Sequence, residues 1–417
     1  MLPISSKSGE LTPFVDALFT ATSATCVTGL IVYDTYTHWS IFGQLVILLL
    51  IQIGGLGFIT IITMLSILMG KKIGLFQRTL VMESVGFLQL GGAIRMVIRM
   101  FKGTFFIEGL GALLLSLKFI PRFGLLKGIY YGIFHSVSAF CNAGFDLMGV
   151  DTPFSSVTSF SCDATVILTI SALISIGGIG FLVWDDVLTN KKDFDKYKLH
   201  SKIVLTSTAF LIIAGALGFL LLESNHAFKA MGAKETVLSA IFASVSPRTA
   251  GFNSVDLLKL GNASIFLTII LMAVGASPGS TGGGLKTTTV AVMLLSAVSS
   301  SRDSDSVSAF KKKIDGEALR KASAICTMYF VCAALSCLLI LAFEPFSVKE
   351  VMFEVFSAIG TVGLTLGITP ELTGVSKIIL VLLMTGGRVG SLTVALALTK
   401  KRETVLLDRP EEKITVG

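Results

Sequence analysis

Four short segments carry the residues of this chain whose types and spacing are suited to chemistry. They lie about 110 residues apart, and each places a glycine between a half-apolar stretch and a polar turn that leads into a long apolar run. Around one axis, four such segments would present a ring of backbone carbonyl oxygens, which is how a protein strips water from a cation. The pattern predicts a potassium filter. Its glycines are Gly29, Gly144, Gly251 and Gly363, and the carbonyls of Thr28, Ala143, Ala250 and Val362 are expected to add a second ring.

A second set of residues interrupts the apolar runs that follow the filter segments. Segment 275–284 has five glycines and one proline, so it is expected to break the helix and form a loop inside the membrane. Arg388 lies in the last apolar run, where an arginine costs about 2.5–3.5 kcal/mol to insert. We expect it to donate to the loop carbonyls and oppose cation passage, although a purely structural bond between helices is the alternative. The expected gate consists of Gly279, Gly282, Gly283, Gly284 and Arg388.

Other candidate sites are weaker. The loop nearly matches the phosphate-binding pattern G-x-x-x-x-G-K-[ST], but Leu285 occupies the lysine position and no strand precedes it. Glu108 and Asp163 are candidates for proton relay, and pairing with neighbouring cations is the more common role of such carboxylates. His135 is expected to be packed or hydrogen-bonded. With four histidines and no catalytic or metal-ligand cluster in the sequence, we expect no enzyme site and no resident metal.

The composition is that of an integral membrane protein. Hydrophobic residues make up 53% and charged residues 15%, with a mean hydropathy of +0.81, whereas soluble domains carry about 25% charged residues. Several runs reach the roughly 20 apolar residues that a spanning helix needs, which predicts an all-α fold. These runs are about 41–69, 104–119, 164–184, 203–222, 264–299, 322–343 and 376–399.

The positive charges indicate the orientation in the membrane. The net charge of +7 is concentrated in alternate loops, at 71–102, 191–202, 311–321 and 400–402. These loops and the C-terminus are expected to be cytoplasmic, so no nucleic-acid partner is needed to explain the charge. Lys311–Lys313 is expected to contact lipid headgroups or a cytosolic partner. The six cysteines have no CxxC pair and are expected to be free thiols, and no signal peptide is recognised.

Each repeat is expected to contain an outer helix, a short re-entrant helix, the filter segment and an inner helix. The re-entrant helices are predicted at 13–25, 128–140, 235–247 and 348–359. Alignment on the filter glycine places Val245 where the other repeats have Ser23, Ser138 and Ser357. The first repeat lacks its outer helix, so we expect the true chain to begin some 25 residues earlier. The predicted units are repeats 1–72, 73–190, 191–300 and 301–400, followed by a tail at 401–417.

These motifs together resemble the Trk/Ktr/HKT superfamily of potassium transporters, most closely the KtrB-type membrane subunits of bacterial Ktr systems. The resemblance covers essentially the whole chain. It implies four M1–P-loop–M2 repeats in a pseudo-fourfold arrangement around a single pore, potassium uptake across the bacterial plasma membrane, and a homodimer. It also implies a cytosolic KtrA-like ring that binds the regulatory nucleotide, with no cofactor in this chain. In that superfamily a serine in the first filter accompanies sodium transport, so Gly29 favours potassium.

Two rival functions are weighed against the pore. An ion-coupled secondary transporter for potassium or sodium would use the broken third inner helix as an alternating-access site. Parallel re-entrant repeats favour the pore, because alternating access usually accompanies inverted halves. A membrane-embedded enzyme has no catalytic cluster to support it.

Overall fold

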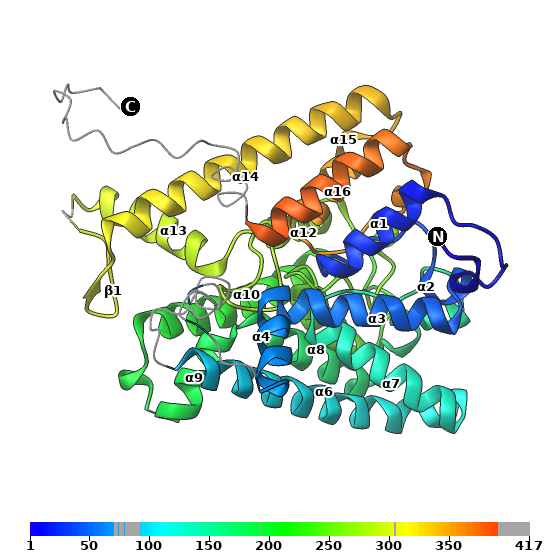
Figure 1. The fold of residues 1–417 in the computed structure, drawn as a ribbon. Helices are drawn as coiled ribbons and strands as arrows, with labels where there is room; N and C mark the ends of the chain where they lie inside the picture. Colours follow the sequence, from blue (N-terminus) through cyan, green and yellow to red (C-terminus); the bar gives the residue numbers. More distant parts are fainter. Residues whose placement is uncertain (71–73, 75–78, 80–91, 192, 304–305, 391–417) are drawn as a thin grey trace.

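The structure is a computed structural model that describes residues 1–417 except 71–73, 75–78, 80–91, 192, 304–305 and 391–417. The described part is almost wholly helical, as predicted (Figure 1). The predicted tail at 401–417 lies outside it. The helices and strands are α1 (Phe14–Thr25), α2 (Thr35–His38), α3 (Ile41–Leu56), α4 (Phe58–Leu68), α6 (Ala93–Phe123), α7 (Leu125–Phe140), α8 (Ala164–Gly178), α9 (Phe181–Asn190), α10 (Leu199–Glu223), α11 (Ala233–Val245), α12 (Asn262–Ala273), α13 (Thr287–Ser301), β1 (Ser308–Ala309), β2 (Lys312–Lys313), α14 (Gly316–Phe343), α15 (Val348–Ile359) and α16 (Gly374–Val389).

Short 3-10 turns and one antiparallel hairpin complete the described structure. In the hairpin, β1 pairs with β2 so that Ser308 lies opposite Lys313. The 3-10 turns are Pro3–Ser5, Met148–Val150, Thr158–Phe160, Phe194–Lys196, Leu257–Lys259 and Thr369–Glu371.

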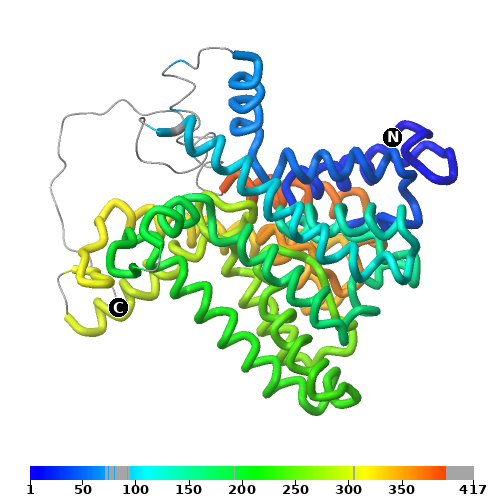
Figure 2. Tube along the Cα trace, turned by 90° about the horizontal axis from the view of Figure 1, so that it is seen from below, coloured from blue at the N-terminus to red at the C-terminus, as the bar shows by residue number. Residues whose placement is uncertain are grey.

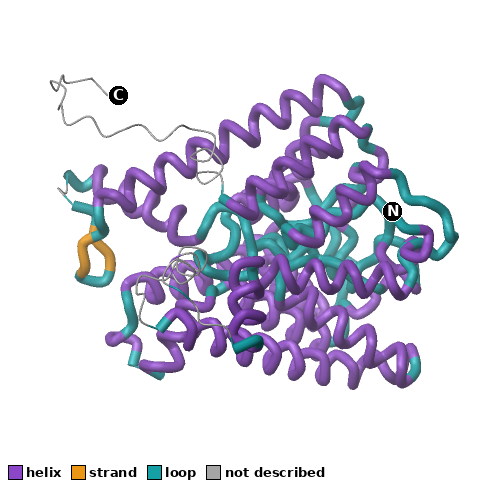
Figure 3. Tube along the Cα trace, in the orientation of Figure 1, coloured by secondary structure: helices purple, strands orange, loops and turns teal. Residues whose placement is uncertain are grey.

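A short helix precedes each filter glycine. These helices are α1, α7, α11 and α15, and their bounds lie within three residues of the predicted re-entrant helices. Figure 3 shows loop segments gathered in the middle of the helical body. Helices α6, α10 and α14 are long and apolar enough to cross a membrane, and two bent pairs, α3 with α4 and α8 with α9, raise the number of candidate spans in the described part from three to five.

The short helices pack in a closed ring. Each contacts the inner helix of its own repeat: α1 contacts α3, α7 contacts α8, α11 contacts α12, and α15 contacts α16. Each also contacts the inner helix of the preceding repeat: α7 contacts α3, α11 contacts α8, α15 contacts α12, and α1 contacts α16. Because the last of these contacts joins the fourth repeat to the first, the four repeats surround one axis.

A buried ion pair lies where the ring closes. Lys377 of α16 donates to a carboxylate oxygen of Asp16 in α1 over 2.8 Å, and the two side chains are only 10% and 12% exposed. Tyr33 donates to the other oxygen of Asp16 over 2.8 Å. Since a buried carboxylate is tolerated only when it is paired or hydrogen-bonded, these contacts fix α1 against α16.

Glycines break the inner helices. Gly57 (φ +85°) separates α3 from α4 at a 95° bend, and Gly180 (φ +91°) separates α8 from α9 at a 94° bend. Figure 2 shows α4 turning away from α3. The predicted break at 275–284 is confirmed, because α12 ends at Ala273 and α13 begins at Thr287. In the fourth repeat, α16 ends at Val389, and the next residue, Gly390, has a φ of +98°. Glycine reaches such angles without a steric penalty.

The side chains are distributed as expected for a protein surrounded by lipid. Large apolar residues are exposed on the outer helices, including Phe106 on α6, Leu221 on α10 and Leu338 on α14. Polar residues such as Ser138 and Ser357 are fully buried near the axis. A soluble protein of this size would place most of its polar residues outside.

Candidate functional site

The four predicted filter glycines meet one another at the axis. A Cβ atom added to any of them would collide with the carbonyl oxygen that precedes the filter glycine of the next repeat. The order is cyclic, from the first repeat to the second, third and fourth and back to the first. The distance from the added Cβ to the carbonyl oxygen is 2.6 Å for Gly29 and Ala143, 2.8 Å for Gly144 and Ala250, and 2.6 Å for Gly251 and Val362. It is shortest for Gly363 and Thr28. Glycine is therefore the residue that allows this approach, and the eight predicted filter residues are brought together.

The backbone of each filter segment has the same unusual conformation. All four filter glycines have positive φ, from +70° at Gly144 to +96° at Gly29. In each repeat, the residue two places before the filter glycine also has a positive φ, although none of these four residues is a glycine. These residues are Val27 (+51°), Asn142 (+58°), Thr249 (+69°) and Thr361 (+50°). Non-glycine residues rarely adopt this region, and such strain is characteristic of functional sites.

A serine in each short helix fixes the filter segment. The Oγ atom of Ser23 accepts from the Gly29 N–H over 3.1 Å, and that of Ser357 accepts from the Gly363 N–H over 3.0 Å. Ser138 instead donates to the Phe145 carbonyl over 2.6 Å. In the third repeat this role belongs to Ser246, which donates to the Phe252 carbonyl. Alignment of the repeats on the filter glycine places Val245, not Ser246, at the position of the other three serines. The sequence analysis therefore missed Ser246 by one residue.

A cavity of about 450 Å³ opens on the other side of the glycine ring from the broken inner helices. All four filter glycines contribute to its wall, together with Asp146, Asp256 and Glu371. Carboxylates at the mouth of a pore raise the local concentration of cations. Under the expected orientation, this cavity is the outer mouth of the pathway.

Potassium uptake is expected to fall about two- to fivefold as the external pH is lowered from 8 to 6. Burial raises the pKa of Asp146 to about 7, although the Met148 N–H donates to its carboxylate over 2.9 Å, and the nearby Asp34 raises it further. Above pH 7 the side chain is anionic and attracts cations, and below pH 7 it is neutral. The measurement is initial uptake against external pH. In the Asp146→Asn variant, uptake should not fall between pH 8 and pH 6. If it falls as in the wild type, another group is responsible for the pH dependence.

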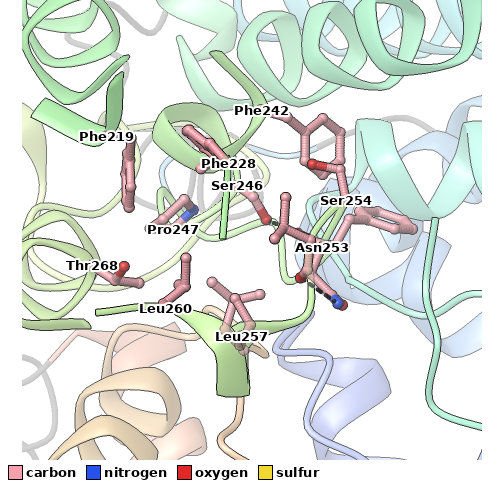
Figure 4. Close-up of a pocket in the computed structure, with 14 residues that line it drawn as sticks. Phe219, Phe228, Phe242, Ser246, Pro247, Asn253, Ser254, Leu257, Leu260 and Thr268 are labelled. Carbon is pink, nitrogen blue, oxygen red and sulfur yellow. Dashed lines mark hydrogen bonds between the residues drawn. The ribbon is translucent and has the colours of Figure 1, made fainter. Parts of the chain in front are cut away.

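Aromatic side chains support the third filter segment from behind. Phe219, Phe228 and Phe242 surround a cavity of about 20 Å³ beside Ser246 and Leu257 (Figure 4). A volume of this size holds about one water molecule. The cavity is therefore part of the packing around the filter and not a route for ions.

The 275–284 loop lies against three filter segments. The Thr281 hydroxyl donates to the Phe140 carbonyl over 3.0 Å at the end of α7. A Cβ atom added to Gly282 would collide with the Thr249 side chain of the third filter segment. The Gly283 N–H donates to the Thr361 hydroxyl of the fourth over 3.1 Å. The loop therefore crosses the axis directly beside the filter.

Two cationic side chains hold this loop by its carbonyls. Arg388 donates to the Thr281 carbonyl and, on the first inner helix, to the Gly54 carbonyl and to the Gly55 carbonyl at 3.3 Å. Lys286 donates to the carbonyls of Gly282 at 2.8 Å and Gly283 at 3.3 Å. Three consecutive loop carbonyls thus accept from cations, and Lys286 is a contributor that the sequence did not single out.

Several N–H groups of the loop donate to other groups of the protein and are therefore not free to bind a phosphate. Gly275, Ser277 and Thr281 donate to backbone carbonyls over 2.8, 2.9 and 3.3 Å. The Gly284 N–H donates to the Gly387 carbonyl over 3.2 Å. A P-loop needs free N–H groups that point toward the anion, so the structure gives no support to nucleotide binding here.

Comparison with known proteins agrees with this geometry. Residues 2–405 match the TrkH family, described as a cation transport protein. The chain belongs to the TrkH family. It is 41% identical to the potassium/sodium uptake protein NtpJ of Enterococcus hirae, over all of this chain and 92% of that one. It is 40% identical to the Ktr system potassium uptake protein B of Bacillus subtilis, over 97% of this chain and 89% of that one.

A solved structure has the same fold. The potassium transporter TrkH of Vibrio parahaemolyticus superposes with a TM-score of 0.75 at 16% identity, covering 93% of this chain and 79% of that one. The relatives are transporters, which supports the expectation that this TrkH-family chain is not an enzyme. Among the described residues, no group of three or more histidine, cysteine or acidic side chains is placed to hold a metal ion.

The remaining candidate residues of this TrkH-family chain have structural partners. Glu108 is buried on α6 and accepts from Gln52 over 3.2 Å. Asp163 caps α8 by accepting from the Thr165 N–H over 2.8 Å, and it pairs with Lys118 over 3.1 Å. His135 is buried and accepts from the Leu147 N–H over 3.3 Å. All six cysteines are free thiols, as expected.

Proposed function

We propose that this chain is the potassium-translocating membrane subunit of an uptake system. Cations would shed water at the ring of Gly29, Gly144, Gly251 and Gly363 and then pass the gate formed by the 275–284 loop and Arg388. The observation that carries this proposal is the cyclic order in which each filter glycine lies against the preceding carbonyl of the next repeat. The membrane potential would supply about 2.3 kcal/mol per charge for each 100 mV.

The proposal includes a partner and a second copy. Three relatives are named as proteins of Ktr systems, which supports a component outside this chain. We propose a cytosolic KtrA-like ring that holds the regulatory nucleotide, and a homodimer of this chain in the bacterial plasma membrane. The C-terminus would be cytoplasmic, on the same side as Lys311–Lys313.

A sodium-coupled potassium transporter is the second candidate. It is favoured by the relative that is named a potassium/sodium uptake protein. In this mechanism the broken segment between α12 and α13 would exchange access between the two sides. A fixed ratio of sodium to potassium flux would distinguish it from the pore.

Potassium, rubidium and sodium flux into liposomes containing the purified chain, at a clamped diffusion potential, tests the proposal. Flux that follows the potential, with potassium and rubidium ahead of sodium, is the expected result. Flux that requires a sodium gradient would favour the coupled transporter. If flux stays absent after the partner ring is added, the pore proposal fails.

Replacing Gly29 with serine is expected to raise sodium flux relative to potassium about tenfold, equivalent to about 1.4 kcal/mol. The added Cβ would meet the Ala143 carbonyl at 2.6 Å, and Gly29 has a φ of +96°. The ring must widen to accept it, which weakens discrimination between the two ions. The sodium-to-potassium flux ratio in liposomes measures the effect, and an unchanged ratio would remove Gly29 from the filter.

A further inference from the structure

A buried carboxylate lies behind the fourth filter segment. Glu354 is on α15, nine residues before Gly363, and is only 1% exposed. It accepts from the Thr365 hydroxyl over 2.7 Å and from the Thr369 hydroxyl. The Oγ1 atoms of Thr369 and Thr365 lie 3.1 Å apart, and the Gly367 N–H donates to the Thr365 Oγ1 over 3.0 Å. The chain that leaves the filter is therefore folded over this carboxylate.

The hydrogen-bonded residues form part of the outer mouth. Thr365 and Gly367 line the same 450 Å³ cavity as Gly363 and the other three filter glycines. The position of this wall thus depends on a side chain that does not itself line the cavity. Removal of the carboxylate would release both threonines at once.

Among the described residues, no cationic side chain pairs with Glu354. Asp16, the buried carboxylate on α1, is paired with Lys377 over 2.8 Å. Burying a charge without a partner is costly, so the two hydroxyl bonds alone compensate Glu354 within the described part of the protein. A cation at the glycine ring would supply the missing opposite charge.

The other repeats hold their filters with different groups. The residues nine places before the filter glycine are Thr20, His135 and Phe242 in the first three repeats. His135 accepts from Leu147, which follows the second filter. The third filter is held from the second repeat, where Ser156 accepts from the Asn253 N–H over 3.1 Å. Among the four, the support of the fourth filter segment includes a buried carboxylate that has no cationic partner among the described residues.

We propose that Glu354 is a positioning residue that sets both the affinity and the selectivity for potassium. Its hydroxyl bonds fix Thr365 and Thr369 at the outer mouth, and its charge favours a cation at the ring of glycines. This inference rests on the proposed function, because it requires that ring to be the path of the ion. The sequence pattern did not single out this residue.

Three variants of the full-length protein test the two contributions. Glu354→Gln preserves the shape of the side chain and removes the charge. The double variant Thr365→Val and Thr369→Val preserves the charge and removes both hydroxyl bonds. Glu317→Gln is the control for the loss of a carboxylate, because Glu317 is exposed at the start of α14, pairs with Lys321 and does not line the mouth.

Potassium flux in liposomes is measured against potassium concentration, together with the sodium-to-potassium flux ratio. Glu354→Gln should raise KM for potassium about fivefold with Vmax within twofold, and the effect should persist at high ionic strength. The double valine variant should raise the sodium-to-potassium ratio at least about threefold. Glu317→Gln should leave KM and the flux ratio unchanged.

Two results would overturn the inference. One is wild-type KM and selectivity in a Glu354→Gln protein that remains monodisperse. The other is an unchanged sodium-to-potassium flux ratio in the double valine variant. This second result decides the question if the Glu354→Gln protein does not fold. Either result leaves the proposed function intact, since wild-type flux tests that function separately. Absence of cation flux in the wild-type protein with its partner would instead reject the proposed function itself.

Discussion

Replacing Gly363 with alanine is expected to reduce potassium flux at least about tenfold, equivalent to about 1.4 kcal/mol or more. Of the four filter glycines, Gly363 would bring an added Cβ closest to a neighbouring carbonyl, that of Thr28. The same Cβ would lie 2.8 Å from the Cα atom of Gly29. Both obstacles are backbone atoms of another repeat, so no side chain can rotate to make room. Flux in liposomes at a fixed potential is the measurement.

Gly367 provides a matched control for this substitution. It has the same φ as Gly363, +94°, but no atom lies within 4 Å of an added Cβ. Gly367→Ala therefore measures the cost of the backbone angle alone, which is about 1–3 kcal/mol of folding stability. If the two alanine variants lower flux equally, the backbone angle and not the contact between repeats explains the loss, and the filter geometry inferred for Gly363 is wrong.

Deleting Gly282–Gly284 from the loop is expected to increase potassium flux about tenfold or more. The deletion removes the segment that lies against Thr249 and Thr361, and it also removes two carbonyls that accept from Lys286. If the loop obstructs the axis, its shortening opens the path. The measurement is flux at saturating potassium. Unchanged or lower flux in a correctly folded protein would show that the loop is a scaffold.

Arg388→Lys separates the charge of the arginine from its geometry. Lysine keeps the positive charge but loses the planar fork, so one ammonium would have to reach Thr281 and the first inner helix together. An intermediate increase in flux is expected if the loop is held mainly by these bonds. Flux equal to that of the wild type would mean that the charge alone opposes the cation.

Much of this fold was predictable from local sequence signals. The four filter glycines, the short helices before them and the break at 275–284 each depend on residues close together in the chain. Five glycines and one proline within ten residues disfavour a continuous helix, and long apolar runs have few alternatives in a membrane. The filter residues and their regular spacing in the sequence therefore indicated that these four segments meet at one axis.

The register of the fourth inner helix was not predictable. The sequence of the inner helices pairs Gly54-Gly55-Leu56-Gly57-Phe58 with Gly386-Gly387-Arg388-Val389-Gly390, but Gly387 is an equally plausible partner for Gly54. In the structure, a Cβ atom added to Gly387 would collide with the Ile359 carbonyl, as one added to Gly54 would with the Thr25 carbonyl. The equivalent of Gly55 is therefore Arg388. Only the contact between helices distinguishes the two alignments.

Glu354 and Ser246 were missed for a related reason. Their roles arise from hydrogen bonds with residues on the far side of the filter, such as Thr369 and Phe252. Glu354 lies in the middle of α15, and a lone glutamate in the sequence does not reveal which distant hydroxyls it will meet. The bends at Gly57 and Gly180 were likewise permitted by the sequence but not required by it.

The ion pair between Asp16 and Lys377 has a consequence for biogenesis. Its partners are 361 residues apart, so the ribosome has made nearly the whole chain before α16 can meet α1. Until then, α3 is the only one of its two inner-helix neighbours that α1 can contact, and the carboxylate of Asp16 lacks the Lys377 ammonium. A prematurely terminated product therefore leaves the ring open on one side. Closure of the ring thus requires the fourth repeat to be made and packed against the first.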